Sequence, residues 1–227
     1  MADERQPRGF TMTWVGSTLD IDQSRRAFRE AGIFFVDTVG RVPPHAMDDP
    51  GLGVWSVREL IGHTCRALLA VEHGAGRESG IPARLARPAD YFCEALKDTS
   101  IHDAIAEGAA GAAAALGEDV STAVAGVVDG VFRFVDSLPD DHPVGTPWGE
   151  MRLADYLPTR TFELVVHTLD LAEALGRVGR VPESALSVAL GLLTEAAART
   201  GRAEELLMAL AGRAPLRSNL LALGPDS

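Results

Sequence analysis

The sequence predicts an all-α protein, and three observations favour that fold class. Apolar residues recur at helical spacing in several long segments, whereas the alternation typical of strands is nearly absent. Glycines and prolines stand between these segments. The chain has 227 residues, of which 46% are hydrophobic and 23% are charged, so it is long enough to bury a full core. We therefore expect a bundle of four longer helices with additional C-terminal helices.

The spacing of apolar residues and the helix breakers predict where each helix lies. Ser56 followed by Glu59 forms a capping-box pattern that marks the start of the second helix. Between the helices, a turn-rich loop is predicted for residues 42–54. A loop with a helical turn at 91–96 is predicted for residues 77–100, and a small hairpin for residues 144–151. The predicted helices are residues 20–41, 56–74, 101–117, 119–138, 152–176, 182–200 and 203–211.

These elements suggest a division of the chain into three parts. Residues 1–18 are expected to form an N-terminal arm, and residues 19–178 the helical bundle. Residues 179–227 are expected to form a helical extension that packs on the bundle. Pro158 lies inside the pattern of the 152–176 helix, so we expect either a kink or a break between Leu157 and Thr159.

Composition and charge exclude several kinds of partner. The formal net charge of −11 argues against sequence-independent nucleic-acid binding and against an anionic membrane surface as the main partner. No run of about 20 apolar residues is present, and the N-terminus lacks the apolar core of a signal peptide. Cys65 and Cys93 are too few for a disulfide framework. We expect a cytoplasmic protein whose partners are small molecules.

The segment Thr159–Gly176 is where chemistry is expected. Glu163 and His167 are four residues apart, so they stand one turn apart on the same helix face and can bind one metal ion. His63, on the capped second helix, is the best candidate for a third ligand. Two histidines and one carboxylate suit zinc with an open fourth position, which is the pattern of catalytic sites.

Arg160 and Asp170 share the helix face of Glu163 and His167, and each allows two interpretations. Asp170 could orient His167 or pair locally, while Arg160 could receive a substrate carboxylate or pair with Glu163 or Asp155. Cys65 is interpreted as a packed core thiol. The remaining histidines are expected on the solvated surface: His45, His73, His102 and His142.

Two segments resemble a known family. They are Trp-Ser-Val-Arg-Glu-Leu-Ile-Gly-His, ending at His63, and Arg-Thr-Phe-Glu-Leu-Val-Val-His-Thr-Leu-Asp-Leu-Ala, starting at Arg160. Together they resemble the mycothiol-dependent maleylpyruvate isomerase family of the DinB/YfiT-like superfamily of metal-binding four-helix bundles. The resemblance covers roughly residues 20–176 and implies a DinB-like bundle.

By this resemblance, His63, Glu163 and His167 are the metal ligands, and the cofactors are Zn²⁺, or another divalent metal, with mycothiol as cosubstrate. It implies isomerisation or S-transfer on a small electrophilic substrate, and a homodimer. The isomerase itself carries a separate α/β C-terminal domain, whereas the residues after Gly176 predict helices. This difference favours a related thiol transfer over maleylpyruvate isomerisation. The alternatives are a metal-dependent hydrolase that uses bound water and a non-catalytic bundle that binds a small molecule.

Overall fold

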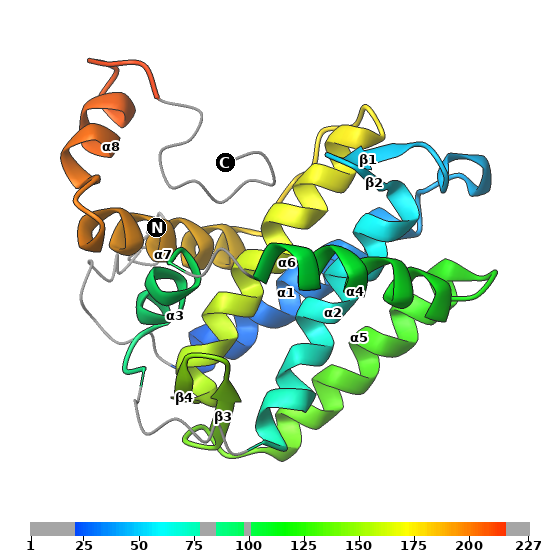
Figure 1. Ribbon diagram of the computed structural model, residues 1–227, viewed down its shortest axis with the longest axis horizontal. Coiled ribbons are helices and arrows are strands. Elements are labelled where there is room, and N and C mark those ends of the chain that lie inside the picture. Colours follow the sequence, from blue (N-terminus) through cyan, green and yellow to red (C-terminus); the bar gives the residue numbers. More distant parts are fainter. Residues whose placement is uncertain (1–20, 78–84, 98–100, 217–227) are drawn as a thin grey trace, which may run out of the picture.

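The protein is all-α, as predicted (Figure 1). The computed structural model describes residues 21–77, 85–97 and 101–216, and the predicted N-terminal arm lies outside them. Its α-helices are α1 (Ile21–Val39), α2 (Val57–Ala75), α3 (Pro88–Ala95), α4 (Ile101–Ala115), α5 (Val120–Ser137), α6 (Leu153–Ala174), α7 (Glu183–Arg199) and α8 (Ala203–Leu210). The short elements are a 3₁₀ turn (Pro44–Ala46) and the strands β1 (Pro50–Leu52), β2 (Trp55–Ser56), β3 (Pro143–Thr146) and β4 (Gly149–Arg152).

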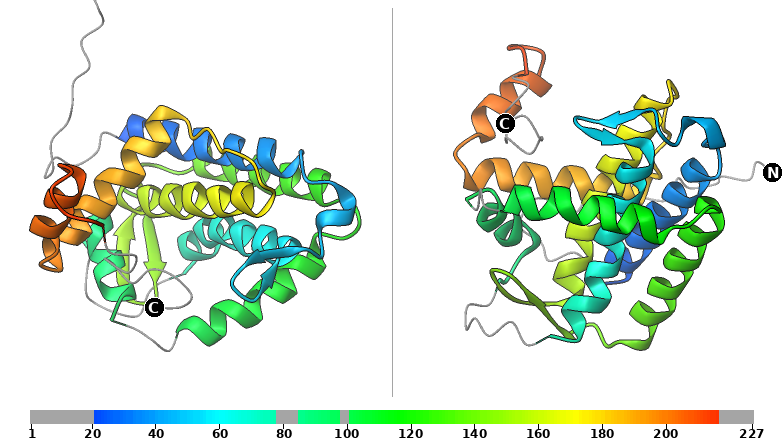
Figure 2. Two further views of the ribbon diagram at one scale, coloured as in Figure 1. Left: turned by 90° about the horizontal axis from the view of Figure 1, so that it is seen from above. Right: turned by 45° about the vertical axis from the view of Figure 1, so that its right-hand side comes forward.

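Four helices, α1, α2, α5 and α6, form the bundle, and α4 packs on the outer side of α2 (Figures 1 and 2). Helix α6 is central to the fold, because it contacts α1, α2, α3 and α7. Leu157, Leu164 and Leu171 on α6 are fully buried, so this helix contributes a large part of the core. Burying a leucine side chain stabilises the folded state by about 1.5–3 kcal/mol.

The capping box predicted at Ser56 is present at the start of α2. The backbone N–H of Glu59 donates to Ser56 Oγ (3.3 Å), and the backbone N–H of Ser56 donates to Glu59 Oε2 (2.9 Å). These bonds satisfy two N–H groups that the first turn of a helix leaves unpaired. They fix the residue at which α2 begins and therefore the face on which His63 lies.

Helix α6 runs without a break through Pro158, so of the two predicted alternatives, a kink or a break between Leu157 and Thr159, the break is wrong. Proline removes one backbone hydrogen bond from a helix interior. The side chains on either side of Pro158 are nevertheless fixed: Leu157 is fully buried, and Thr161 Oγ1 donates to its carbonyl oxygen (3.0 Å). Tertiary packing of this segment outweighs the local preference of proline.

Two segments expected as loops contain more regular structure than the sequence predicts. The turn-rich segment 42–54 includes the 3₁₀ turn and strand β1, which pairs in antiparallel fashion with β2 just after it. The single turn expected at 91–96 is the eight-residue helix α3, which has Pro88 in its first turn and a bond from the backbone N–H of Arg87 to Asp90 Oδ2 (2.8 Å). The hairpin expected at 144–151 is confirmed as β3–β4.

The two C-terminal helices differ in how they pack. Helix α7 lies against α1, α3 and α6, and Ala185, Val188 and Leu192 are among its buried residues. Helix α8 has no buried residue and packs against α7. In the described part of the chain, no single helix is both long and apolar enough to span a membrane. The segments Gly108–Ala115 and Val120–Ser137 reach that length and hydropathy only together, across a 105° bend.

Gly62 lets α2 and α4 approach each other closely, one residue before His63. A Cβ atom added to Gly62 would lie 2.5 Å from the backbone nitrogen of Ala113 and 2.9 Å from its Cα atom. Those neighbours are backbone atoms, so they cannot turn away as a side chain would. Gly126 on α5 is a contrasting helical glycine, because it is exposed and an added Cβ would meet nothing within 4 Å.

We predict opposite effects for alanine at these two glycines. Gly62→Ala should lower the free energy of unfolding by about 1–3 kcal/mol, because overpacking forces α2 and α4 apart. Gly126→Ala should raise it by about 0.5–1 kcal/mol, because alanine is the better helix former and fits without contact. Urea denaturation of both variants checks this. Equal effects of the two substitutions would contradict the close approach of α2 and α4.

Candidate metal centre

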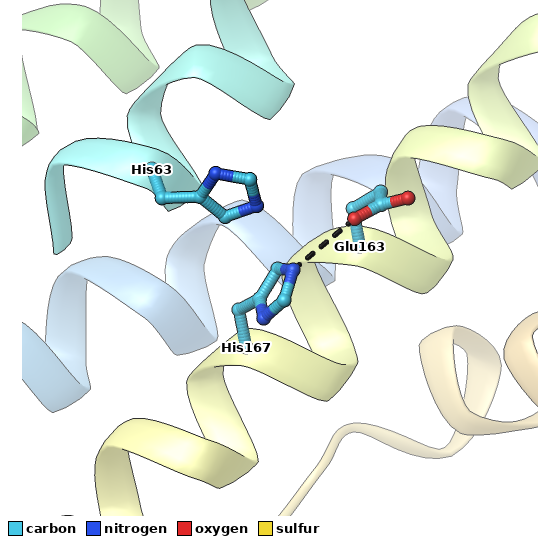
Figure 3. A group of neighbouring side chains, drawn as sticks. All are labelled: His63, Glu163 and His167. Atoms are coloured by element: carbon cyan, nitrogen blue, oxygen red, sulfur yellow. Dashed lines mark ion pairs between the residues drawn. The ribbon is translucent and has the colours of Figure 1, made fainter. Parts of the chain in front are cut away.

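Two helices bring together the three residues that the sequence predicts as metal ligands. His63 projects from α2, and Glu163 and His167 project from α6, one turn apart (Figure 3). The helices contact each other directly, and the fully buried Leu60 and Leu164 lie three residues from His63 and His167, respectively. The three polar side chains therefore meet inside an otherwise apolar contact between helices.

The geometry of these side chains fits one small ion. One ligand atom from each of His63, Glu163 and His167 lies within 4.8 Å of the other two. His167 Nε2 is 3.2 Å from Glu163 Oε2, and the two imidazole rings are edge-to-face with centroids 4.7 Å apart. Two imidazoles and one carboxylate are a donor set that zinc accepts in catalytic sites.

An unpaired polar atom also marks this site. His63 Nδ1 is buried and has no hydrogen-bond partner among the described residues. The other ring nitrogen, Nε2, points toward Glu163 (Figure 3), so it is the atom that would contact an ion, while an ordered water would satisfy Nδ1. The indole of Trp55 packs against the His63 ring, with centroids 4.5 Å apart, and restrains its orientation. The residues present therefore fit a metal ion.

Asp170 contacts the outer nitrogen of His167. Asp170 Oδ2 lies 3.1 Å from His167 Nδ1, so a proton on Nδ1 would leave Nε2 free to face Glu163. A carboxylate on the far side of a ligating histidine is a common arrangement, because it fixes the ring and increases its basicity. The contact fits both interpretations of Asp170, because it orients the His167 ring and is also a local pair within one helical turn.

Arg160 lies on the same face and is almost completely buried, with 5% of its surface exposed. Its Nη2 is 4.0 Å from Glu163 Oε1, which is an ion pair beyond hydrogen-bonding distance. The other carboxylate considered for Arg160, Asp155, instead pairs with Arg152 at 2.7 and 3.1 Å.

The protonation states of the ligands differ although they lie side by side. Burial lowers the pKa of His63 to about 4, and the charge of His167 adds to this effect. Burial is the largest single effect on Glu163 and on His167 and opposes their charged forms, but their mutual hydrogen bond and the neighbouring charges together outweigh it. That bond, with the Arg160 charge, lowers the pKa of Glu163 to about 2. Hydrogen bonds to Asp170 and Glu163 raise the pKa of His167 to about 9. At neutral pH, His167 and Glu163 form an ion pair beside a neutral His63.

Sequence reasoning missed three aromatic residues beside the site. Trp55 packs on His63, and Tyr91 and Tyr156, which contact each other, both pack against the guanidinium of Arg160. Tyr156 precedes Arg160 by one helical turn, so its position was a usable signal. Tyr91 lies on α3, in a segment that the sequence predicts as mostly loop, and nothing local connects it to α6.

The remaining histidines and both cysteines lie elsewhere. His45 and His73 are exposed, as predicted, while the side chain of His102 is outside the described ones. His142 is half-buried rather than solvated, because its Nε2 contacts the carbonyl oxygen of Ala75 (3.1 Å) at the end of α2. Cys65 is a buried free thiol, and burial raises its pKa to about 12, which makes it a poor nucleophile.

The fold and the site together define a helical bundle with a half-buried two-histidine, one-carboxylate cluster. The model of the mycothiol maleylpyruvate isomerase N-terminal domain family matches residues 28–172, which is more than half of the chain. The chain therefore belongs to this family, and the match includes His63, Glu163 and His167. Comparisons with curated proteins and with solved structures found no match.

The ion pair of His167 predicts how stability depends on alkaline pH. The pKa of His167 is about 9 in the folded protein and 6.5 for an unperturbed ring. The contribution of protonated His167 to the free energy of unfolding is therefore complete below about pH 6.5 and is lost as pH rises through about 9. In chelator-treated protein, urea denaturation should give a lower free energy of unfolding at about pH 9.5 than at about pH 7.

Two variants separate this effect from other alkaline titrations. His167→Gln should remove most of the decrease in the free energy of unfolding between about pH 7 and about pH 9.5, because glutamine cannot take up the proton. Asp170→Asn should reduce it, because it removes one acceptor that holds the proton on His167. An unchanged pH dependence in His167→Gln would contradict the assignment.

Proposed function

We propose that this protein is a zinc-dependent enzyme that uses mycothiol in isomerisation or S-transfer on a small electrophilic substrate. The observation that carries the proposal is the convergence of His63, Glu163 and His167 within 4.8 Å inside the bundle. The family supports an association with mycothiol. A cytoplasmic location, a homodimer and the absence of nucleic-acid and membrane partners stay predictions.

The residues of the chain have separate roles in this proposal. His63, Glu163 and His167 would hold the ion, and Asp170 would keep the His167 ring oriented through Nδ1. Zinc with three protein ligands keeps a fourth position, where it lowers the pKa of a thiol or water so that a nucleophile exists at neutral pH. The buried leucines around the site limit solvent access, which strengthens electrostatic interactions there.

Ion binding should compete with a proton on His167. His63 is already neutral at pH 7 and Glu163 is already ionised, because their pKa values are about 4 and about 2. His167 must lose its proton before Nε2 can ligate. Metal–ligand bonds would therefore replace the ion pair between Glu163 and His167.

One test of the proposed function measures the metal content of the protein. Protein purified without added zinc, or loaded with zinc and then desalted, should retain about one metal ion per chain by elemental mass spectrometry. His63→Ala and His167→Ala should lose most of it. His73→Ala is the matched control, because His73 is an exposed histidine on the same helix as His63, and it should retain the ion. Equal metal content in wild type and His167→Ala would contradict the proposed centre.

Another test of the proposed function asks whether the nucleophile is a thiol or water. With monochlorobimane as a generic electrophile, the zinc-loaded protein should accelerate formation of the mycothiol conjugate, in which a C–S bond forms and chloride leaves. The acceleration should disappear in His167→Ala and on chelation. Zinc-dependent hydrolysis of an ester probe without any thiol would instead favour the hydrolase. If zinc binds and neither reaction is accelerated, the non-catalytic bundle becomes the better interpretation.

A further inference from the structure

A cavity of about 170 Å³ lies between the C-terminal end of α1, the C-terminal end of α6 and the segment that follows α6. Its walls include Phe34 and Thr38 of α1, Ala172 of α6, and Gly179. Ala172 follows His167 by five residues, which corresponds to about 140° around the helix. The cavity and the candidate metal centre therefore lie on different faces of α6, and a ligand in the cavity would be separate from the ion.

The chain that follows α6 forms one wall of this cavity. Gly176 has a φ of +63°, which glycine adopts without strain, and the backbone N–H of Arg177 donates to the carbonyl oxygen of Ala172 (2.8 Å). These two features turn the chain back against α6. Gly179 then packs so closely that an added Cβ would lie 2.9 Å from Leu169 Cδ2. The backbone on this side of the cavity is therefore held in place.

Three arginines line the cavity, and the N–H groups of their side chains are unused. Arg41 follows α1, whereas Arg177 and Arg180 follow α6. Within residues 21–77, 85–97 and 101–216, none of the three makes an ion pair, a side-chain hydrogen bond or a cation–π contact. Arg77 is the one other arginine in these ranges without such a partner. Unpaired guanidinium groups are thus concentrated at one cavity, in a chain whose formal net charge is −11.

Local roles at the helix ends do not use these N–H groups. Basic side chains near a helix C-terminus often donate to its last carbonyl oxygens. Arg41 and Arg177 lie beside such ends, yet neither side chain donates to a carbonyl oxygen in the described part of the chain. Asp37 also lines the cavity but pairs with none of the three arginines there, so the lining keeps a formal charge of +2. An anion is therefore the kind of ligand that this cavity would attract.

We propose that this cavity is a binding site for a phosphate group, either as inorganic phosphate or as part of a small phosphomonoester. Guanidinium groups bind phosphate through charge-assisted hydrogen bonds that are frequently bidentate. A phosphate group offers three strong acceptor oxygens and a carboxylate two, so three arginines around one cavity favour phosphate. The proposal does not depend on the metal centre or on the proposed function.

The size of the cavity limits what it can enclose. A volume of about 170 Å³ equals that of about five or six water molecules in the liquid. It is smaller than the roughly 300–1,000 Å³ of pockets that enclose drug-sized ligands. The cavity therefore has room for the phosphate group itself, and the organic part of a phosphomonoester would stay outside it.

Isothermal titration calorimetry on the full chain at low ionic strength tests the site. Wild type should bind one inorganic phosphate per chain with a Kd of about 1 mM or lower. Acetate, the carboxylate probe, should bind at least about tenfold more weakly. Glycerol 3-phosphate distinguishes the two sources of the phosphate group. Tighter binding of this ester than of inorganic phosphate identifies a phosphomonoester as the ligand, and weaker binding identifies the free ion; both results support the site.

Single substitutions assign the binding to the cavity. Arg41→Gln, Arg177→Gln and Arg180→Gln should each weaken phosphate binding at least about fivefold, because the carbonyl ends of α1 and α6 offer an anion no donor. Arg77→Gln is the matched control, because it removes the same charge from an exposed, unpaired arginine outside the cavity. It should stay within about twofold of wild type, whereas Asp37→Asn should strengthen binding about two- to fivefold by removing a like charge.

Four results would overturn the proposal. They are a phosphate Kd above about 20 mM in wild type, equal binding of acetate and phosphate, and an equal loss in Arg77→Gln and in the cavity variants. The fourth is a loss of phosphate binding after treatment with a chelator and dialysis, which would place the phosphate on the metal ion. All five substituted side chains are exposed, so circular dichroism should show each variant folded as wild type.

Discussion

The contact between α2 and α6 is the feature on which the rest of the structure depends. Polar side chains placed between two apolar helix faces must find partners, because an unpaired buried polar group costs several kcal/mol. Glu163 and His167 meet that requirement by pairing with each other, whereas His63 Nδ1 has no hydrogen-bond partner among the described residues. The surrounding structure fixes the geometry: the capping box sets the start of α2, Gly62 allows α4 to approach, and α6 continues through Pro158.

Charge in this contact is balanced around Glu163. Its carboxylate faces the imidazolium of His167 and lies near the guanidinium of Arg160, while Asp170 holds the far side of the His167 ring. A divalent cation would replace the proton on His167 Nε2 and would face the same Glu163 carboxylate. The same residues therefore account for a stable arrangement without an ion and are the ones that, in the proposal, would hold it.

The fold and the ligand cluster could be predicted because their signals are local. Glu163 and His167 are related by one helical turn, and the Ser56–Glu59 pattern fixes the helix that carries His63. Helix α3 and the position of Tyr91 depend on tertiary contacts with α6 and α7, which no local pattern encodes. Pro158 shows that a local signal can also mislead. Proline disfavours a helix interior, but α6 continues through it because the neighbouring Leu157 and Leu164 are packed in the core. Helical spacing puts Arg160 on the face of Glu163 and His167, but only the structure shows that two tyrosines pack against its guanidinium.

X-ray absorption at the zinc edge tests the central claim most directly, because it identifies the atoms bound to the ion. The account predicts a first shell of nitrogen and oxygen at about 2.0–2.2 Å with scattering from two imidazole rings. Adding a thiol should introduce one sulfur at about 2.3 Å. A shell without imidazole scattering, or a sulfur ligand present before any thiol is added, would contradict a centre built from His63, Glu163 and His167.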